Sequence, residues 1–290
     1  MIIYALALLI AALWLVIVQY STPHRLANDT IRYQAMAQGK KVMRPWNLRI
    51  IVPLLFGRIT WLWRSMTMLC LVLIAPVLVW FLKLQGIGDM PALIGVLFYL
   101  GCAGIVHFNV EYPYLVDAQA MLLSLISACL FLSDMRYIAF LVALLAVLTK
   151  ETSPVFIALF SWSIYPLLVL VIPIALLLLM KKVDEDIIFG KLYRPNQWFK
   201  QGKKELTNPK VMLLPWGLLL LLALLAPSWQ LGLALAVGYG QIVVASDRMR
   251  LYQQVFPVVI LCAVSAPIAL GWFLPVAIMN LYNPFADLPN

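Results

Sequence analysis

Five ionisable residues stand where the chain passes between apolar and polar sequence, and they are the residues best placed for chemistry. Asp29 follows the first apolar run, and Glu111 and Asp117 lie in one polar-aromatic loop. Lys150 and Glu151 stand between two apolar runs. Ionisable groups at the edge of a membrane helix bundle are expensive to bury, and they are usually functional or paired. A carboxylate in such a place can act as a general base, and a cation can bind a phosphate.

The composition of the chain is that of an integral membrane protein. Of its 290 residues, 64% are hydrophobic and 11% are charged, against about a quarter charged in soluble domains. The net charge of +9 does not indicate nucleic-acid binding, because the sequence has no separate basic domain. Eight of the 21 Lys and Arg residues lie in 21–64 and eight in 181–210. Basic residues at bilayer edges contact headgroup phosphates, so anionic lipids are expected partners and nucleic acid is not.

The cysteines and histidines do not indicate a redox or metal centre. The four cysteines lie in separate apolar runs without a CxxC pair, as small core residues do. His24 and His107 lie near predicted span ends, where a structural role is expected.

The apolar runs predict a single all-α membrane domain over 1–290, a polytopic bundle of eight to ten transmembrane helices. Residues 1–20 are predicted to be a retained span and not a signal peptide, because the run has no early Lys or Arg and ends in bulky residues. The other predicted spans are 66–84, 91–107, 118–132, 137–149, 211–226, 228–245 and 255–281.

Residues 154–180 allow two interpretations, and the choice decides the topology. Pro166 and Pro173 interrupt this apolar run, so it is one long kinked span or two short ones. With a cytoplasmic N-terminus, one span places 181–210 inside, where loops rich in Lys and Arg prefer to lie. Two spans place 181–210 outside, and charge alone does not decide between them.

Polar residues also predict where two helices begin. Thr152 or Ser153 is expected to be an N-cap, with Pro154 in the first turn of the helix that follows. Asp117 stands just before another helical run and would be a good N-cap there.

Residues 21–64 form the first polar segment, a juxtamembrane loop with an amphipathic pattern. The pattern predicts one or two short helices that lie in the membrane interface. Aromatic and basic side chains of this loop are predicted to anchor it at the interface. They are Trp46, Trp61, Trp63, Arg44, Arg49, Arg58 and Arg64.

With a cytoplasmic N-terminus, the five ionisable residues named first all fall on the outer face of the membrane. Span counting places Asp29, Glu111 and Asp117 there, together with the Lys150–Glu151 pair. A shared site on that face is one interpretation. The other is that each acid pairs with a nearby Arg or caps a helix.

The sequence has no P-loop, GxGxxG, HExxH or GxSxG motif of a soluble enzyme. Instead, the pattern D-x3-Y-x3-A-x-G at 29–39, followed by PWNLRIIVPLL, resembles the first extracytoplasmic loop of the GT-C superfamily. These polytopic glycosyltransferases take sugars from polyprenyl-phosphate carriers. Three further segments resemble the family in the same order, PYLVDAQAMLLSL at 113–125, LLAVLTKETSPVFIAL at 144–159 and SDRMRLYQQVFPVVIL at 246–260.

The resemblance implies inverting sugar transfer at the extracytoplasmic face of a membrane, with Asp29 as general base and Asp117 as the second catalytic acid of the family. Lys150, Arg248 or Arg250 would stabilise the leaving phosphate. The resemblance also favours two short spans in 154–180. The substrate-binding residues expected on this basis are Tyr33, Arg49, Glu111, Lys150, Glu151, Arg248 and Arg250.

One departure from the family concerns metal binding. Members often have paired acids in the first loop, whereas Asn28 stands beside Asp29 here, so no cofactor is expected and a divalent metal is not supported. The expected location is a bacterial inner membrane, within the cell envelope. Two alternatives stay open: a non-catalytic subunit that works with a protein partner, and a lipid or solute transporter. The transporter is less favoured because the sequence shows neither internal repeats nor midplane charges.

Overall fold

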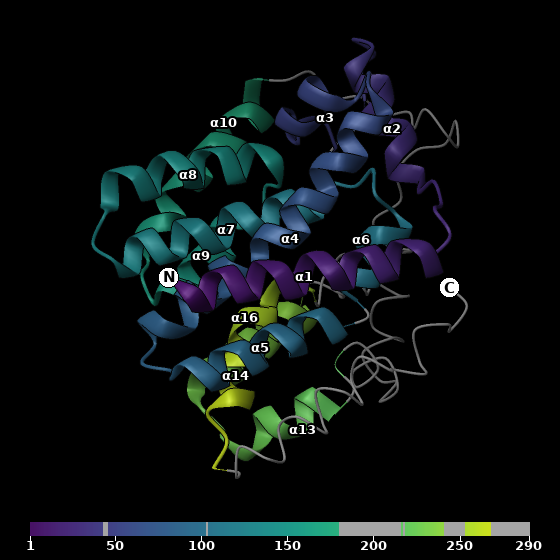
Figure 1. Ribbon diagram of the computed structural model, residues 1–290. Helices are drawn as coiled ribbons and strands as arrows, with labels where there is room; N and C mark the ends of the chain where they lie inside the picture. Colours follow the sequence, from purple (N-terminus) through teal and green to yellow (C-terminus); the bar gives the residue numbers. More distant parts are fainter. Residues whose placement is uncertain (43–45, 103, 180–215, 217, 241–252, 268–290) are drawn as a thin grey trace. The chain divides into compact units, whose positions relative to one another are not determined.

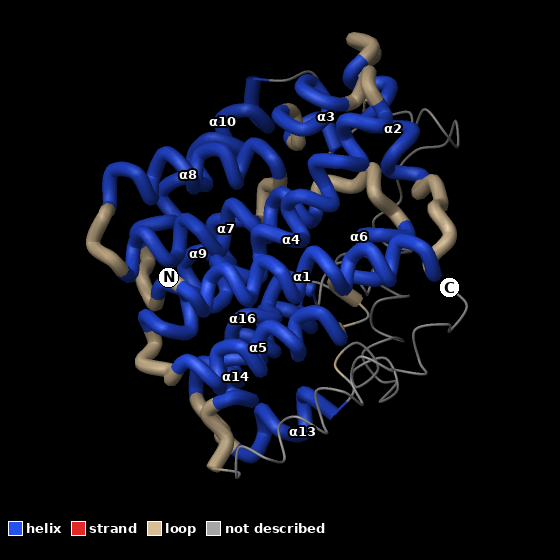
Figure 2. The backbone as a smooth tube through the Cα atoms, in the orientation of Figure 1, coloured by secondary structure: helices blue, strands red, loops and turns tan. Residues whose placement is uncertain are grey.

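The computed structural model describes residues 1–42, 46–102, 104–179, 216, 218–240 and 253–267. All regular elements in these ranges are helical, with loops between them (Figure 1, Figure 2). The prediction of an all-α fold is confirmed for this part of the chain. Arg248, Arg250, the loop 181–210 and the last predicted span beyond 267 lie outside the described residues.

The chain divides into two compact units that are interleaved along the sequence. The first unit comprises Met1–Thr22, Ala75–Phe108 and the described residues after 194. The second unit comprises Pro23–Ile74 and the described residues of Asn109–Tyr193. Whether both units form the predicted single membrane domain stays a prediction.

Two helices of the described residues are long and apolar enough to cross a membrane. They are α1 (Ile2–Ser21) and α4 (Thr60–Leu84). The apolar helices α5 (Asp89–Gly101), α7 (Asp117–Leu132) and α8 (Arg136–Thr149) are shorter. The 16 residues of α7 extend about 24 Å at ~1.5 Å per residue, less than the roughly 30 Å of a hydrocarbon core. The number of transmembrane spans therefore stays a prediction.

The predicted helix over 91–107 is not continuous. Helix α5 ends at Gly101, Cys102 has extended backbone, and α6 (Val106–Glu111) begins after it. The apolar run continues through this break, so hydropathy alone gave no signal for it.

The apolar run 154–180 is also broken. Helix α9 (Ser153–Ser161) is followed by Trp162, its C-cap, whose φ of 52° lies in the left-handed region. A 3-10 helix, η2 (Tyr165–Leu170), and α10 (Val171–Leu179) follow. The run is therefore not one long helix, although the side of the membrane on which 181–210 lies stays a prediction.

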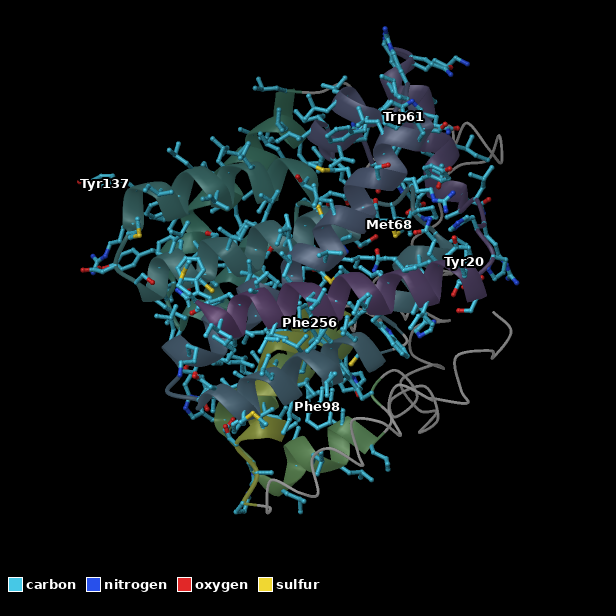
Figure 3. All side chains as sticks on the ribbon, in the orientation of Figure 1. Tyr20, Trp61, Met68, Phe98, Tyr137 and Phe256 are labelled. Carbon is cyan, nitrogen blue, oxygen red and sulfur yellow. The ribbon has the colours of Figure 1, made fainter. Side chains whose placement is uncertain are left out.

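The core of the first unit is packed from α1, α5, α13 (Leu218–Leu225), α14 (Trp229–Gly240) and α16 (Phe256–Val264). Tyr99 and Phe256 stack with ring centroids 5.4 Å apart, and Phe98 and Phe256 are both buried (Figure 3). Gly95 allows close packing of α5, because an added Cβ would lie 2.7 Å from Leu82 Cδ1 and 3.1 Å from Ile260 Cγ2.

The second unit is built on the hairpin of α7 and α8. A tight turn joins the two helices, and Asp134 in it has a φ of 60°. Ser127 Oγ on α7 donates a 2.8 Å hydrogen bond to the carbonyl of Ala139 on α8. Because α7 and α8 form a hairpin, the end of α8 and the turn that follows it lie at the same end as the start of α7. Helix α9 packs against both helices.

The juxtamembrane loop contains α2 (Asn28–Ala37), the 3-10 helix η1 (Trp46–Leu48) and α3 (Ile51–Phe56). The prediction of short helices in 21–64 is confirmed. Arg58 Nε donates a 2.8 Å hydrogen bond to the carbonyl of Ala37, at the end of α2. An added Cβ at Gly57 would lie 2.5 Å from both Ala37 Cβ and the carbonyl oxygen of Pro53. Glycine is therefore required where α3 meets the end of α2.

Candidate functional site

Asp29 lies in the first turn of α2 and forms an ion pair with Arg32 of the same helix. Arg32 Nη1 is 2.9 Å from Asp29 Oδ1, at the i, i+3 spacing that brings side chains together on one helix face. Both side chains are largely buried, and the Arg32 guanidinium lies 4.0 Å from the ring centre of Trp46. An acid in the first turn also suits the positive end of the helix dipole.

Arg49 joins α2 to the turn between α8 and α9. Its Nε and Nη2 donate hydrogen bonds of 2.8 Å to the two carboxylate oxygens of Glu151. Its Nη1 donates a third bond of 2.8 Å to the hydroxyl of Tyr33. This bidentate geometry is the strong form of an arginine–carboxylate pair, and it connects positions 102 residues apart in the sequence.

The Glu151 carboxyl is held in its charged form. Burial by itself raises its pKa, but the charge and hydrogen bonds of Arg49 outweigh this effect and leave the pKa below its ordinary value of 4.5. The neighbouring charge of Lys150 acts in the same direction.

Lys150 and Asp117 form a second, more deeply buried ion pair. Lys150 Nζ lies 2.6 Å from Asp117 Oδ1, and the two side chains are 4% and 0% exposed. Asp117 is the first residue of α7, and Val116 is its N-cap. The prediction of Asp117 as an N-cap is therefore wrong, because its carboxylate contacts the lysine and is not a helix cap.

A layer of hydrogen bonds from α4 holds the segment that leads into α7. Trp63 Nε1 donates to the carbonyl of Leu115 at 3.4 Å, and Thr67 Oγ1 donates to the carbonyl of Pro113 at 2.7 Å. Gln119 Nε2 donates to Thr67 Oγ1 at 2.9 Å. These bonds fix the start of α7, and with it the position of the buried Asp117.

The tryptophans of the juxtamembrane loop do not all lie where the sequence predicts. Trp61 is 69% exposed and can serve as an interfacial anchor. Trp46 and Trp63 are buried, against Arg32 and between Tyr33 and Tyr114 respectively. The prediction that these two are interfacial anchors is wrong, because they pack the core beneath α2.

Glu111 contacts the chain just before α2. Its carboxylate lies 3.0 Å from Arg25 Nε, and its carbonyl accepts a 2.7 Å hydrogen bond from the Arg25 amide. Next to it, His24 Nδ1 is 3.0 Å from the carbonyl of Val110, which gives that histidine a structural contact. These contacts tie the entry of α2 to the end of α6.

The structure thus brings most of the predicted site residues into one unit. We call the contacts of Tyr33, Arg49, Glu151, Lys150 and Asp117 the ion-pair network. Asp29 lies one turn before Tyr33 on α2. Each of the four acids nevertheless pairs with a cation, Asp117 with a lysine and the other three with an arginine.

Sequence reasoning missed three polar residues of the site: Arg32, which pairs with Asp29, and Thr67 and Gln119, which hold the start of α7. The i, i+3 spacing of Asp29 and Arg32 was a usable signal. Thr67 and Gln119 lie in apolar runs, where nothing in the sequence pairs them.

Among the residues that the structure describes, no group of three or more His, Cys, Asp or Glu side chains could hold a metal ion. No protein-family model, curated protein or solved structure matches the chain.

Proposed function

We propose that this protein is a membrane glycosyltransferase that moves a sugar from a polyprenyl-phosphate carrier to an acceptor at the extracytoplasmic face. The observation that carries the proposal is the meeting of separate sequence segments in the second unit. The segments around Asp29, Asp117 and Lys150 resemble one enzyme family. They contain two largely buried ion pairs, Asp29–Arg32 and Lys150–Asp117, and the bonds of Arg49 to Tyr33 and Glu151 connect α2 to the turn that contains Lys150.

The cost of burying these charges supports a functional role. Exchanging a buried ion pair for apolar residues of similar volume is often neutral or stabilising. Two such pairs, Arg49–Glu151 and Lys150–Asp117, lie side by side along the chain here. Stability alone gives little reason to retain them, whereas binding of a charged substrate does.

The surface of α8 supports a membrane location. Its large apolar side chains Ile138, Leu141 and Leu145 are exposed, while the small Ala139 and Ala143 are buried. Small residues at helix contacts and large apolar residues outside are typical of helices packed in lipid. Tyr137, at the start of the helix, is 91% exposed, as expected for an aromatic anchor at the membrane surface (Figure 3).

In the proposed reaction, Asp29 acts as the general base. Its carboxylate takes the proton of an acceptor hydroxyl or amine as the acceptor atom forms a bond to the anomeric carbon. The bond from that carbon to the phosphate oxygen breaks, and polyprenyl phosphate leaves with the electron pair. A phosphate leaves without a protonating acid, so one positioned carboxylate is sufficient, unlike the two of glycoside hydrolases.

The cations of the site have two proposed tasks. Arg32 orients the Asp29 carboxylate through their 2.9 Å contact. Lys150 stabilises the charge that develops on the leaving phosphate, and Asp117 holds the lysine in place through their 2.6 Å contact. Asp117 is then a positioning residue and not a second base.

The proposal is tested by replacing Asp29 and Asp117 separately with Asn in the source cell. Glycan or lipid modification in the cell envelope is measured at matched protein levels. Asp29→Asn is expected to abolish the modification and Asp117→Asn to reduce it. Asp89→Asn is the matched control, since Asp89 pairs with Lys83 at an exposed site. Wild-type modification in both site variants rejects the enzyme.

The second candidate function is a non-catalytic membrane subunit that retains the architecture of the site. The pairing of every acid in the site with a cation favours it, because such pairs also serve a purely structural role. Under this alternative, deletion of the chain abolishes the modification while Asp29→Asn leaves it intact.

A further inference from the structure

Several buried polar atoms near the ion-pair network have no hydrogen-bond partner among the described residues. Three of them are Oγ1 of Thr30, Oδ1 of Asn47 and Oγ of Ser153, in residues that are 1%, 6% and 1% exposed. Trp46 Nε1 and Thr152 Oγ1 are also buried and unpartnered. Buried polar atoms are almost always satisfied, so a group of exceptions requires an explanation.

The contacts of Arg49 bring these residues to one region of the second unit. Thr30 lies one turn before Tyr33 on α2, and Tyr33 accepts a hydrogen bond from Arg49. Asn47 is two residues before Arg49 in the chain. Ser153 is two residues after Glu151, which Arg49 holds in its bidentate pair. Each of the three unpartnered residues therefore stands within three residues of a group in the Tyr33–Arg49–Glu151 contacts.

The start of α9 shows that local structure does not satisfy these hydroxyls. Thr152 occupies the N-cap position that the sequence predicts, yet no side-chain hydrogen bond caps the helix. On the same helix, the hydroxyl of Ser161 donates a 2.7 Å bond to the carbonyl of Ile157. The hydroxyls of Thr152 and Ser153, next to Glu151, make no such bond.

The mixture of donors and acceptors indicates the chemistry of the missing partner. Asn47 Oδ1 only accepts, Trp46 Nε1 only donates, and the Thr and Ser hydroxyls do both. A fully ionised anion has no hydrogen to donate to the Asn47 oxygen. A neutral ligand with several hydroxyl groups satisfies all of them.

We propose that Thr30, Asn47 and Ser153 form a recognition subsite for the hydroxyl groups of a sugar ring, beside the Arg49–Glu151 pair. This inference rests on the proposed function and assigns the sugar, as distinct from the carrier phosphate, to particular side chains. Arg49 is then a positioning residue, whose pair with Glu151 holds two sides of the subsite together.

The test uses the full-length chain purified in lipid nanodiscs. The probes are polyprenyl phosphate alone and polyprenyl phosphate linked to glucose, galactose or mannose. Affinity for each probe is measured by thermal shift and by titration. The sugar increment is the ratio of the affinity for the best sugar-linked probe to that for the bare carrier phosphate. Wild type is expected to show an increment of at least tenfold.

Ser153→Ala and Asn47→Ala are expected to reduce the sugar increment about three- to tenfold each and to leave affinity for bare polyprenyl phosphate unchanged. Ser161→Ala is the matched control on the same helix, and it should leave the increment unchanged. Without ligand, Ser153→Ala should not lower the melting temperature, because no hydrogen bond is lost, whereas Ser161→Ala should lower it.

A wild-type increment that both subsite variants retain overturns the subsite and leaves the proposed function standing. A loss of ligand-free stability in Ser153→Ala equal to that in Ser161→Ala also overturns it, because the hydroxyl is then satisfied by ordered water. If wild type itself shows no increment for any sugar, the subsite and the proposed sugar transfer both fail.

Discussion

At the scale of single residues, Arg49 connects two segments of the second unit that are 102 residues apart in the sequence. Its one guanidinium contacts Tyr33 on α2 and both carboxylate oxygens of Glu151. Only arginine supplies donors in this fixed fork, since a lysine ammonium is a point charge on a flexible stem. Arg49 therefore holds α2 to the turn between α8 and α9 by geometry as well as by charge.

Replacing Arg49 with Leu should destabilise the protein by about 3–5 kcal/mol, because the largely buried Glu151 would lose its counter-charge. Arg49→Lys should cost less, since the charge remains while the fork is lost. The measurement is unfolding by denaturant in detergent micelles. Arg136→Leu is the control, because its pair with Asp134 is exposed and worth little. Equal stability of Arg49→Leu and Arg136→Leu would contradict this account of the pair.

The depressed pKa of Glu151 predicts a pH-dependent contribution to stability. Because the pKa is lower in the folded protein than its ordinary value of 4.5, ionised Glu151 stabilises the fold above that value. The contribution is lost as pH falls through the folded pKa. The stability difference between wild type and Glu151→Gln should therefore be largest near neutral pH and shrink in acid. A difference that grows as pH falls would show that the sign is wrong.

At the scale of elements, the corner between α2 and α3 fixes the helix that carries Asp29. Gly57 lets the end of α3 approach Ala37 closely, and Arg58 bonds the Ala37 carbonyl at the end of α2. Helix α2 is therefore held at its C-terminal end by packing and at its N-terminal side by the Arg25–Glu111 contact.

Gly57→Ala should destabilise the second unit by roughly 1–3 kcal/mol, because the added methyl group would overlap Ala37 Cβ and the Pro53 carbonyl. Gly86→Ala is the comparison, because its methyl group would meet open space and its cost would be backbone strain at a φ of +81°. In hydrogen exchange, Gly57→Ala should raise the exchange of α2 amides and Gly86→Ala should not. Unchanged protection of α2 in Gly57→Ala would refute the close contact.

Several elements could be predicted from the sequence because their signals are local. The polar-apolar pattern of 29–39 indicates α2, and KETSP indicates the start of α9. The break at Trp162 could not be predicted, because a tryptophan with positive φ has no sequence signature. The burial of Trp46 and Trp63 was missed because tryptophan at a membrane edge and tryptophan in a core look alike in sequence.

Most residues of the candidate site could be predicted from the sequence, but the contacts between them could not. Ionisable residues in apolar sequence identified Asp29, Asp117, Lys150 and Glu151. The pairing of Arg49 with Glu151 spans 102 residues, and no local pattern specifies such a contact. The unpartnered Ser153 could not be foreseen either, because its sequence position is that of an ordinary helix start.

At the scale of the whole molecule, large apolar side chains lie on the surface of both units. In the first unit, α1 exposes Leu9, Leu13 and Ile17, and in the second, α8 exposes Leu141 and Leu145. Contiguous apolar surface of this kind is rare on monomeric soluble proteins. Lipid is the environment that would stabilise it, and α1 and α4 are long enough to cross that environment.

Cysteine labelling in native membranes tests this assignment. Leu141→Cys should resist a charged maleimide, as expected for a helix face that lies against acyl chains. Asp134→Cys, in the exposed turn before α8, should react with it in membrane sheets whose two faces are both open to the reagent. The native cysteines give little background, since all four are buried. Equal labelling of the two variants in intact membranes would place the α8 face in water.

The measurement that bears most directly on the proposed function is sugar transfer by the purified chain in proteoliposomes. Donors are radiolabelled polyprenyl-phosphate sugars, and cell-envelope extract of a deletion strain supplies the acceptor. Wild type and Asp89→Asn are expected to transfer the sugar with release of polyprenyl phosphate, and Asp29→Asn is expected to lose about 100-fold or more of this activity. Transfer by Asp29→Asn at the wild-type rate, in equally folded protein, would contradict the proposed function.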